Sequence, residues 1–391
     1  MRKISQTFQV PFSYEVHFTR DLFAENNHLL KDLIGSARDQ KTAKILVVVD
    51  EGVIAAHTQL ITGITNYAHN GNLGIKLVCP PLVVPGGETV KNDNRHVKTI
   101  LNAVNEFGLD RHAYLIAIGG GSVLDMAGFA ATIAHRGIRH IRVPTTVLAQ
   151  NDAGVGVKNG INQFGKKNFI GCFSPPFAVI NDSAFLSTLE DRDWRCGITE
   201  AIKVALIKDR DFFKQIQQNT GTLLSRDASS MDLLIYQCAK LHLDHISRGG
   251  DPFEKGSSRP LDFGHWAAHK LEQLTDYRLR HGEAVAIGIA LDSIYSQLIG
   301  LLSQAALHEI LTLFKNLKFK LFVPELLADT GHKNPVMDGL NEFREHLGGK
   351  LTIMLLKDIG EGVEVNDIDY EQMQHAILEL KKFDEETVPK C

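Results

Sequence analysis

Buried-strand patterns alternate with helical patterns through the first half of this 391-residue sequence. Residues 44–50 (KILVVVD) and 113–118 (AYLIAI) are continuous apolar runs of strand length. Residues 92–107 and 123–135 have helical character, and residues 138–143 are another strand-like run. Strand–turn–helix alternation of this kind predicts a largely parallel sheet with helices on both faces, because parallel strands are usually joined by a helical crossover.

The pattern changes near Asp182, after which strand-like runs become scarce. Helical segments are expected at residues 195–207, 211–218, 231–246, 265–274, 283–302, 304–317 and 370–382, and residues 351–356 (LTIMLL) form the only clear late strand pattern. We therefore expect two domains: an α/β N-terminal domain over residues 1–182 and a mainly α-helical C-terminal domain over residues 183–391.

Charge and cysteine content limit the kinds of partner and compartment. A net charge of −4 with scattered basic residues gives no reason to expect nucleic acid or an anionic membrane as a partner. The five cysteines include no CxxC pair, which is typical of reduced thiols and leaves histidine and carboxylate side chains as the available metal ligands. The N-terminus lacks an apolar signal core and no run has transmembrane length, so a cytoplasmic protein is expected.

A glycine-rich turn at residues 118–127 (IGGGSVLDMA) follows a predicted strand and opens a helix. Glycine lets the backbone approach a phosphate closely, and the helix N-terminus adds amide donors. Asp50, at the end of an earlier strand, suits contact with a ribose hydroxyl. The turn does not have the GxGxxG pattern, so a purely structural turn and a simple helix cap at Asp50 are the alternatives.

Residues 151–167 (NDAGVGVKNGINQFGKK) combine charged and amide side chains, among them Asp152, Lys158 and Lys167, with four glycines. Such a mixture could grip a phosphorylated, hydroxylated ligand. A solvated glycine-rich surface loop is the alternative for the same composition.

Three histidines lie in residues 262–283 (DFGHWAAHKLEQLTDYRLRHGE). His265 and His269 are four residues apart, so on a helix they share a face and could hold a divalent metal with further N or O ligands. The alternative is a pair of partly buried histidines that hydrogen-bond to backbone carbonyls. No glutamate follows His265, which excludes the HExxH motif of a metalloprotease.

Two apolar helices also carry charged side chains. Residues 197–207 (GITEAIKVALI) contain Glu200 and Lys203 on one face, and residues 231–246 present Lys240, His242 and His245. A charge on a segment that otherwise favours burial is a candidate functional group. The alternative at Glu200 and Lys203 is an ordinary intrahelical ion pair worth about 0.2–0.5 kcal/mol.

Several ordered motifs over residues 50–359 together resemble the sugar phosphate cyclases, the family of 3-dehydroquinate synthase. They are PGGETVK, GGGSVLDMAGFAA, RGIRHIRVPTTVLAQNDAGVGVKNGIN, GKKNFIGCFSPP, FLSTL, GITEAIK and the FGH and HGEAVA pair. The resemblance implies a dehydroquinate synthase-like fold, with an N-terminal nucleotide-binding α/β domain and a helical metal-binding domain. Glycerol dehydrogenase and iron-type alcohol dehydrogenases share that architecture, so a polyol dehydrogenase is a further alternative.

The resemblance also implies roles for individual residues. Glu200, His265 and His281 match ligands of a zinc ion, for which cobalt or another divalent metal could substitute, whereas His269 matches a residue that faces the substrate. The positions that match NAD contacts are Asp50, Glu88, Lys91, Gly120, Gly121, Ser122, Asp125, Thr145, Thr146, Lys167, Phe185 and Thr188. The positions that match the substrate site are Asp152, Lys158, Asn168, Lys203 and Lys240, with Arg344 as the equivalent of a C-terminal lysine. Arg136 matches an arginine that, in dimeric relatives, reaches the neighbouring subunit's phosphate site, so a homodimer is expected.

The sequence departs from 3-dehydroquinate synthases where those enzymes bind the substrate carboxylate. Ser258 stands in place of an arginine, with Arg259 beside it, and Asp262 stands in place of an asparagine. An ionised Asp262 would repel a carboxylate, and losing the arginine would cost about 1.5–3 kcal/mol of charged hydrogen bonding. We therefore expect a small-molecule sugar phosphate without a carboxylate, sedoheptulose 7-phosphate, which would be oxidised, lose phosphate, be re-reduced and close to a valiolone-type cyclitol. Arg259 could restore carboxylate binding, so 3-dehydroquinate synthase activity stays open, as does a protein that only binds ligand.

Overall fold

The computed structural model describes residues 2–36, 42–69, 74–249, 253, 260–327, 334–346 and 349–387. The chain divides into two compact units, one of residues Met1–Thr145 and Ala153–Thr188 and the other of Thr146–Asp152 and Leu189–Cys391. Sequence patterns placed a boundary at residue 182; the structure places the last residue of the first unit at Thr188 and gives Thr146–Asp152 to the second.

A seven-stranded parallel sheet forms the centre of the first unit, in the order β1-β9-β6-β5-β2-β3, with β4 also paired to β2. The strands are β1 (Glu15–Thr19), β2 (Ala43–Asp50), β3 (Ile75–Leu77), β4 (Leu82–Val84), β5 (Tyr114–Gly119), β6 (Arg139–Pro144) and β9 (Ala178–Asp182). The predicted parallel sheet is confirmed. Its central strands β2 and β5 are buried along almost their whole length, which is why they read as continuous apolar runs.

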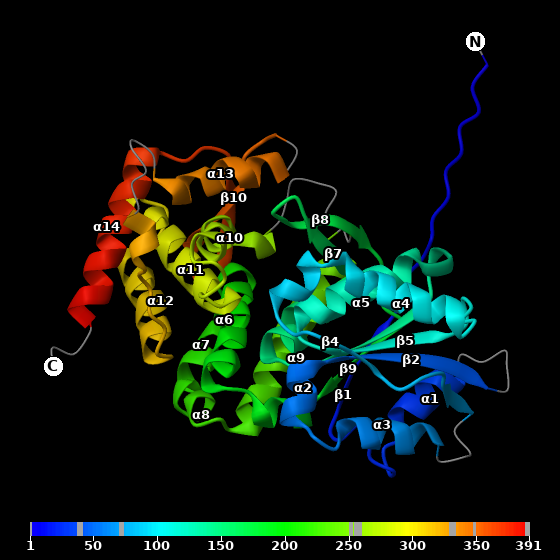
Figure 1. The fold of residues 1–391 in the computed structure, drawn as a ribbon. Helices are drawn as coiled ribbons and strands as arrows, with labels where there is room; N and C mark the ends of the chain where they lie inside the picture. Colours follow the sequence, from blue (N-terminus) through cyan, green and yellow to red (C-terminus); the bar gives the residue numbers. More distant parts are fainter. Residues whose placement is uncertain are drawn as a thin grey trace. The chain divides into compact units, whose positions relative to one another are not determined.

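Helices cover both faces of this sheet (Figure 1). α1 (Leu29–Ser36) and α3 (Leu60–His69) pack on one face, where Ile45, Val47 and Val49 of β2 join their apolar residues in one core. α4 (Asn94–Glu106) and α5 (Gly121–Ile133) lie on the other face. The remaining short elements of this unit are α2 (Glu51–Ala56), η1 (Glu88–Asn92), η2 (Ala134–Arg136) and η4 (Ser183–Thr188).

An antiparallel hairpin follows the sheet's sixth strand, where the sequence suggested only a loop. β7 (Lys158–Gln163) and β8 (Lys166–Phe173) pair around the turn at Phe164 and Gly165, both of which have positive φ. Glycines and asparagines hide the strand pattern here. β7 is mostly buried, whereas β8 is largely exposed.

The second unit is mainly helical, as predicted. Its elements are η3 (Ala149–Ala153, of which Ala153 counts with the first unit), α6 (Asp191–Lys208), α7 (Arg210–Gln218), α8 (Thr220–Leu224), α9 (Ala228–Arg248), η5 (Pro260–Asp262), α10 (His265–Leu274), α11 (His281–Leu298), α12 (Gln304–Asn316), η6 (Pro324–Leu327), α13 (Pro335–His346), β10 (Ile353–Asp358), β11 (Glu361–Val365) and α14 (Tyr370–Thr387). β10 is the predicted late strand, and β11 is its antiparallel partner. Every residue of α11 from Gly282 to Ser296 except Glu283 is buried, so this helix is the centre of the unit.

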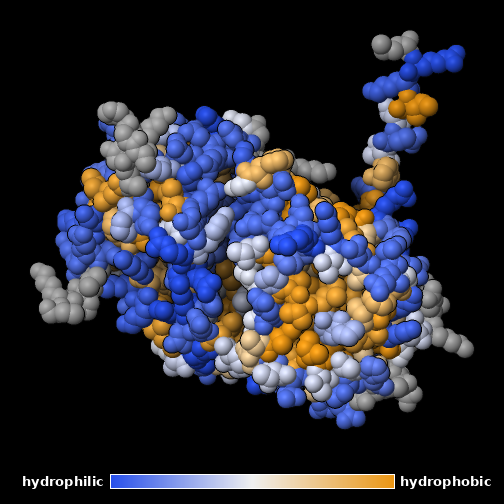
Figure 2. Space-filling model, in the orientation of Figure 1, coloured by the Kyte–Doolittle hydropathy of each residue, from blue (hydrophilic) through white to orange (hydrophobic). Residues whose placement is uncertain are grey.

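Some large hydrophobic side chains of the first unit are exposed to solvent. Figure 2 shows hydrophobic residues gathered on one face of the first unit. Val83 of β4 is 55% exposed. Within the described part of the chain, no helix combines the length and the apolar character needed to cross a bilayer.

Candidate active site

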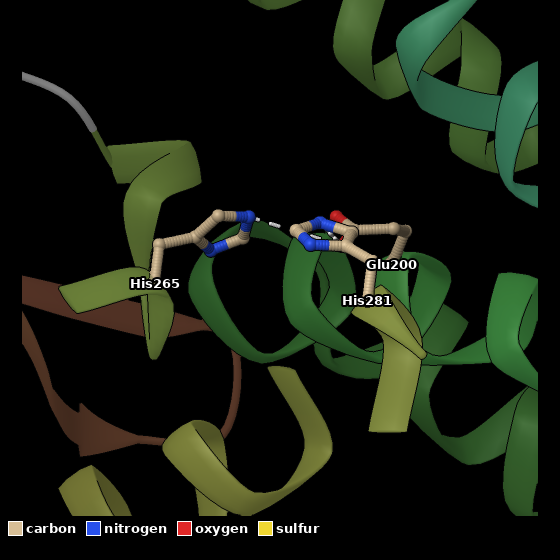
Figure 3. A group of neighbouring side chains, drawn as sticks. All are labelled: Glu200, His265 and His281. Carbon is tan, nitrogen blue, oxygen red and sulfur yellow. Dashed lines mark ion pairs between the residues drawn. The ribbon is translucent and has the colours of Figure 1, made fainter. Parts of the chain in front are cut away.

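Glu200, His265 and His281 converge from three helices of the second unit. Glu200 lies within α6, and the two histidines are the first residues of α10 and α11. His265 Nε2 is 3.9 Å and His281 Nε2 is 3.6 Å from Glu200 Oε1, so both imidazoles point toward one carboxylate (Figure 3). Their ligand atoms all lie within 4.8 Å of one another.

Close backbone packing brings α11 to α6. A Cβ on Gly282 would overlap the backbone of Cys196, so only glycine permits this approach directly beside His281. Arg192 of α6 reinforces the contact, because its Nε and one terminal nitrogen lie 2.6 and 2.5 Å from the two carboxylate oxygens of Glu283. Glu283 also accepts a hydrogen bond of 2.9 Å from the backbone N–H of Arg280, which fixes the start of α11.

The second nitrogen of each histidine also has an oxygen neighbour. His265 Nδ1 is 3.1 Å from the carbonyl oxygen of Phe263, and His281 Nδ1 is 3.2 Å from Glu272 Oε2. A proton on each Nδ1 leaves the lone pair of each Nε2 directed toward Glu200. Glu272 has no predicted role in the sequence, although it lies seven residues after His265 and three after His269 and therefore shares their helix face.

The donor set fits a divalent metal ion. Glu200 is fully buried and its Oε1 has no hydrogen-bond partner among the described residues. Burial raises the pKa of Glu200 and lowers that of His265 well below its usual value, so a neutral imidazole faces a carboxylate that needs a positive charge. Two imidazole nitrogens and one carboxylate oxygen form the ligand set of an open zinc site, in which a fourth position is left for substrate or water.

A second set of possible ligands, His269, Glu272 and His281, shares one histidine with the first. In that set Glu272 contacts Nδ1 of His281, which is the usual position of a carboxylate that orients a metal-bound imidazole. Two ligand groupings can thus be compared. A set of Glu200, His265 and His281 accounts for the contacts of Glu200 with both histidines and of Glu272 with His281. A metal-binding pair of His265 and His269 accounts for none of these three contacts.

Lys203 supplies a buried positive charge next to this group. It is 2% exposed and contacts Glu200 Oε2, one turn earlier on α6. Burial alone would lower the pKa of Lys203, but the carboxylates of Glu200, Asp152 and Asp262 outweigh it and raise that pKa. Lys203 is therefore a permanent cation at neutral pH. Asp262, in η5, belongs to the same electrostatic cluster; Ser258 and Arg259 lie outside the described residues.

Asp152 is held in a single π-helical turn, a feature that often occurs at functional sites. The preceding Asn151 anchors this turn, because its Nδ2 donates a hydrogen bond of 2.8 Å to the carbonyl of Gly197. Asp152 Oδ1 lies 2.7 Å from His242 Nδ1. Burial alone would raise the pKa of Asp152, but Lys203 and His242 hold it well below its usual range. On α9, the described contact of Asp152 is thus made by His242, whereas the predicted Lys240 is exposed.

In the first unit, the glycine-rich turn lies at the carboxyl end of β5, with Gly120 as the N-cap of α5. Asp50 ends β2 and caps α2, since it accepts a hydrogen bond of 2.8 Å from Gly52 N–H. Burial raises the pKa of Asp50, and the backbone N–H of Gly120 opposes that rise, so the turn and the carboxylate lie together. Asp50 is therefore both a helix cap and a neighbour of the turn.

A polar cluster surrounds the start of α5. Ser122 Oγ donates to Glu88 Oε2 over 2.9 Å, and the buried Lys91 Nζ donates to Asp125 Oδ2 over 2.9 Å and to Asn168 Oδ1. Burial alone would raise the pKa of Glu88, but Lys91 and Lys167 lower it. The structure thus brings together six predicted positions: Glu88, Lys91, Ser122, Asp125, Lys167 and Asn168. Gly121, the first residue of α5, lies next to Ser122.

The remaining predicted positions are spread over both units. Thr145 N–H donates to Gly119 O over 3.1 Å, beside the turn, and Thr146 begins the segment that belongs to the second unit. Thr188 and Phe185 contact His57, the C-cap of α2, by a hydrogen bond of 2.8 Å and an edge-on ring contact. Five predicted substrate residues are exposed: Arg136, Lys158, Asn168, Lys240 and Arg344. The described contact of Arg344 is Asn341 Oδ1, 3.2 Å away on the same helix.

Arg142, which sequence analysis did not single out, organises the loop that leads to Lys158. Its guanidinium is fully buried and donates to the carbonyls of Gly154 (3.1 Å), Gly156 (2.7 Å) and Lys158 (2.8 Å). Asn159 Oδ1 accepts a further bond of 2.7 Å. A buried arginine with four acceptors fixes the path of this backbone and so the start of β7.

Comparison with known proteins agrees with this architecture. The model of the 3-dehydroquinate synthase N-terminal region matches residues 81–196, and that of its C-terminal region matches residues 197–337. The chain belongs to the 3-dehydroquinate synthase family. A 3-dehydroquinate synthase of Acinetobacter baumannii is 35% identical over 302 residues, which cover 76% of this chain and 80% of that relative.

Two solved structures extend the comparison to other cyclases. ValA, a 2-epi-5-epi-valiolone synthase from Streptomyces hygroscopicus with NAD+ and Zn2+ bound, superposes with a TM-score of 0.84 at 27% identity and covers 97% of this chain and 99% of its own. A 2-deoxy-scyllo-inosose synthase complexed with carbaglucose-6-phosphate, NAD+ and Co2+ gives 0.75 at 22% identity, over 93% and 96% of the chains, and supports the fold alone. The predicted sugar phosphate cyclase family and dehydroquinate synthase-like two-domain fold are confirmed.

Proposed function

We propose that the chain is an NAD- and metal-dependent sugar phosphate cyclase that converts sedoheptulose 7-phosphate to a valiolone-type cyclitol. In this reaction a secondary alcohol of the sugar is oxidised, phosphate is eliminated, the ketone is reduced again, and the opened chain closes by an intramolecular aldol step. The hydride removed in the first step returns in the third, so the reaction has no net redox change and the enzyme is a lyase.

The two cofactors have separate sets of candidate residues. Glu200, His265 and His281 would hold a divalent metal, zinc or cobalt, and the turn at Gly120 with Asp50 and the cluster around Lys91 would hold NAD. When bound, the metal lowers the pKa of a coordinated substrate hydroxyl and NAD takes up and returns one hydride. ValA, at 27% identity, binds this same pair of cofactors.

The chain's own side chains would position the sugar and its charges. Lys203 keeps its proton and can bind a substrate oxygen on which negative charge develops. Asp152, ionised and held by His242, can accept a hydrogen bond from a sugar hydroxyl. We propose His269, Asn168 and Lys240 as further substrate contacts. Lys158 and Arg136 are proposed at the phosphate, with Arg136 acting across a homodimer, and Arg344 at the C-terminal edge of the site.

The free thiols of Cys79, Cys172, Cys196 and Cys238 agree with a cytoplasmic enzyme.

One observation carries the choice of substrate: the carboxylate of Asp262 lies in the charge cluster of Lys203. Asp262 and Asp152 already surround this lysine with negative charge, so a substrate carboxylate placed there would meet like charges instead of a free cation. Sedoheptulose 7-phosphate has a neutral hydroxymethyl group in place of that carboxylate and avoids the repulsion.

3-Dehydroquinate synthase activity is the alternative, and the names of the relatives favour it. The Acinetobacter baumannii relative is 35% identical, a higher identity than that of ValA. In this case the substrate would be 3-deoxy-D-arabino-heptulosonate 7-phosphate, with Arg259 binding its carboxylate.

The reaction class is tested with purified protein, NAD and a divalent metal. We expect sedoheptulose 7-phosphate to release inorganic phosphate while the NADH absorbance stays flat, and we expect His281→Ala to abolish that release. Net NADH formation from glycerol or a small diol, without phosphate release, would contradict the proposal and indicate a polyol dehydrogenase. A protein that binds the sugar but releases no phosphate would be a binding protein only.

A further inference from the structure

Asp292 is a fully buried carboxylate in the middle of α11. Its Oδ2 accepts a hydrogen bond of 3.2 Å from the backbone N–H of Gly264, and its Oδ1 accepts one of 2.9 Å from the indole N–H of Trp266. These two donors lie on either side of His265. A buried carboxylate requires such partners, and both of these belong to the segment that presents a metal ligand.

The same segment lies directly against α11. Gly264 has a left-handed backbone with φ of +76°, and a Cβ there would come within 2.6 Å of the Ile289 backbone nitrogen. On the α11 side, a Cβ on Gly288 would overlap the carbonyl of Gly264. No side chain separates the two backbones at this crossing, so the position of His265 follows the position of α11.

One helix therefore controls two ligands. α11 begins with His281 and, eleven residues later along the same helix, Asp292 holds the residues before and after His265. The carbonyl of Phe263, next to Gly264, accepts from His265 Nδ1 and sets the ring orientation. Fixing Gly264 and Trp266 thus fixes both the backbone and the ring of the first histidine relative to the second.

The geometry points to Asp292 as a positioning residue for the metal site: it clamps the Gly264–Trp266 segment to α11 so that His265 and His281 present their Nε2 atoms to the same ion. The inference rests on the proposed metal site but does not depend on which sugar is the substrate. A carboxylate is suited to this role because each of its oxygens accepts from a different donor, whereas an amide offers one accepting oxygen only.

If Asp292 had only a structural role, replacing it would lower the stability of the protein without changing metal binding. The experiment therefore measures Co2+ binding and unfolding side by side. The variants are Asp292→Asn, which keeps shape but loses one acceptor, Asp292→Ala, and Trp266→Phe, which removes one donor. The matched control is Ser293→Ala: Ser293 is adjacent and equally buried, but its hydroxyl donates to Ile289 O within its own helix.

We expect Asp292→Asn to raise the Co2+ dissociation constant, measured by chelator competition, about 10-fold or more, and to change the Co2+ absorption spectrum. Trp266→Phe should act in the same direction and Ser293→Ala should leave both readouts unchanged. Wild-type Co2+ affinity and spectrum in both Asp292→Asn and Trp266→Phe, with only a loss of stability, would overturn the inference. Failure of the proposed metal site gives a different result. In that case the wild type would bind no Co2+, or His265→Ala would bind Co2+ as tightly as the wild type does, and the inference about Asp292 would fall as well.

Discussion

His281 Nδ1 lies 3.2 Å from Glu272 Oε2, on the side of the imidazole away from Glu200. The helix that carries His265 thereby also orients the histidine of the next helix. His265, which the sequence pairs with His269 at i, i+4 spacing, instead belongs to a connected set of candidate metal ligands and supporting residues from three helices.

Glu272 should support metal binding without being a ligand. Replacing it with Gln or Ala removes the charge that orients His281, and outer carboxylates of this kind are typically worth about 10–100-fold in metal affinity. Chelator competition for Zn2+ would measure the loss, and Gln273→Ala on the same helix is the matched control. Unchanged affinity in Glu272→Ala would show that the contact has no part in holding the metal.

A variant of His269 distinguishes a metal-binding His265–His269 pair from a metal site made of Glu200, His265 and His281. We expect His269→Ala to retain the metal and to lose turnover, since its proposed role is contact with substrate, whereas His265→Ala and His281→Ala should lose the metal. Metal content after dialysis and kcat are the two measurements. Loss of the metal in His269→Ala, with retention in His265→Ala, would contradict the assignment of Glu200, His265 and His281.

Burial of His140 predicts a pH dependence of stability in the first unit. His140 is 6% exposed, and burial, together with Arg142, lowers the pKa of its imidazole well below 6.5 in the folded state. Because the pKa of His140 is lower in the folded than in the unfolded protein, its contribution to stability is fully present above the unfolded pKa. That contribution is lost as the pH falls below the unfolded pKa, because the unfolded protein then binds a proton that the folded protein does not. The free energy of unfolding should therefore fall by about 1.4 kcal/mol per pH unit below pH about 6.5 on account of this group.

The variant His140→Leu should remove that slope, and His112→Gln, at an exposed histidine of the same unit, should preserve it. Denaturant unfolding at several pH values gives the slopes. Equal slopes in the wild type and His140→Leu would show that His140 is not the group responsible.

Most of the fold could be predicted from the sequence because its periodicities are strong. β2 and β5 are buried on both faces and read as apolar runs, and the helical unit has long segments. The β7–β8 hairpin could not be predicted in this way, because glycines and asparagines such as Gly160 and Asn162 occupy strand positions and a loop composition results. Its pairing depends on packing and not on local propensity.

The sequence pointed to the candidate ligands but not to most of the residues that support them. Glu200, His265 and His281 lie in motifs, whereas Glu272 and Arg142 gain their roles only from tertiary contacts with residues nine or more positions away in sequence. No local pattern marks Asp292 either, since its partners belong to a different helix.

Asp262 should act as a determinant against carboxylate substrates. Removing its charge in Asp262→Asn leaves Lys203 with fewer carboxylate neighbours, so kcat/KM for 3-deoxy-D-arabino-heptulosonate 7-phosphate should rise by about 10-fold, or about 1.4 kcal/mol. Asp211→Asn, which removes an exposed carboxylate of α7, controls for net charge. A fall in that kcat/KM would indicate that Asp262 assists the carboxylate substrate.

The most direct test of the proposed activity is the ratio of kcat/KM for the two seven-carbon sugar phosphates, measured on the wild-type protein by phosphate release with NAD and Zn2+ present. Like-charge repulsion at Asp262 predicts a ratio of about 10 or more in favour of sedoheptulose 7-phosphate over 3-deoxy-D-arabino-heptulosonate 7-phosphate. Phosphate release from the carboxylate sugar alone would contradict it and identify the chain as a 3-dehydroquinate synthase.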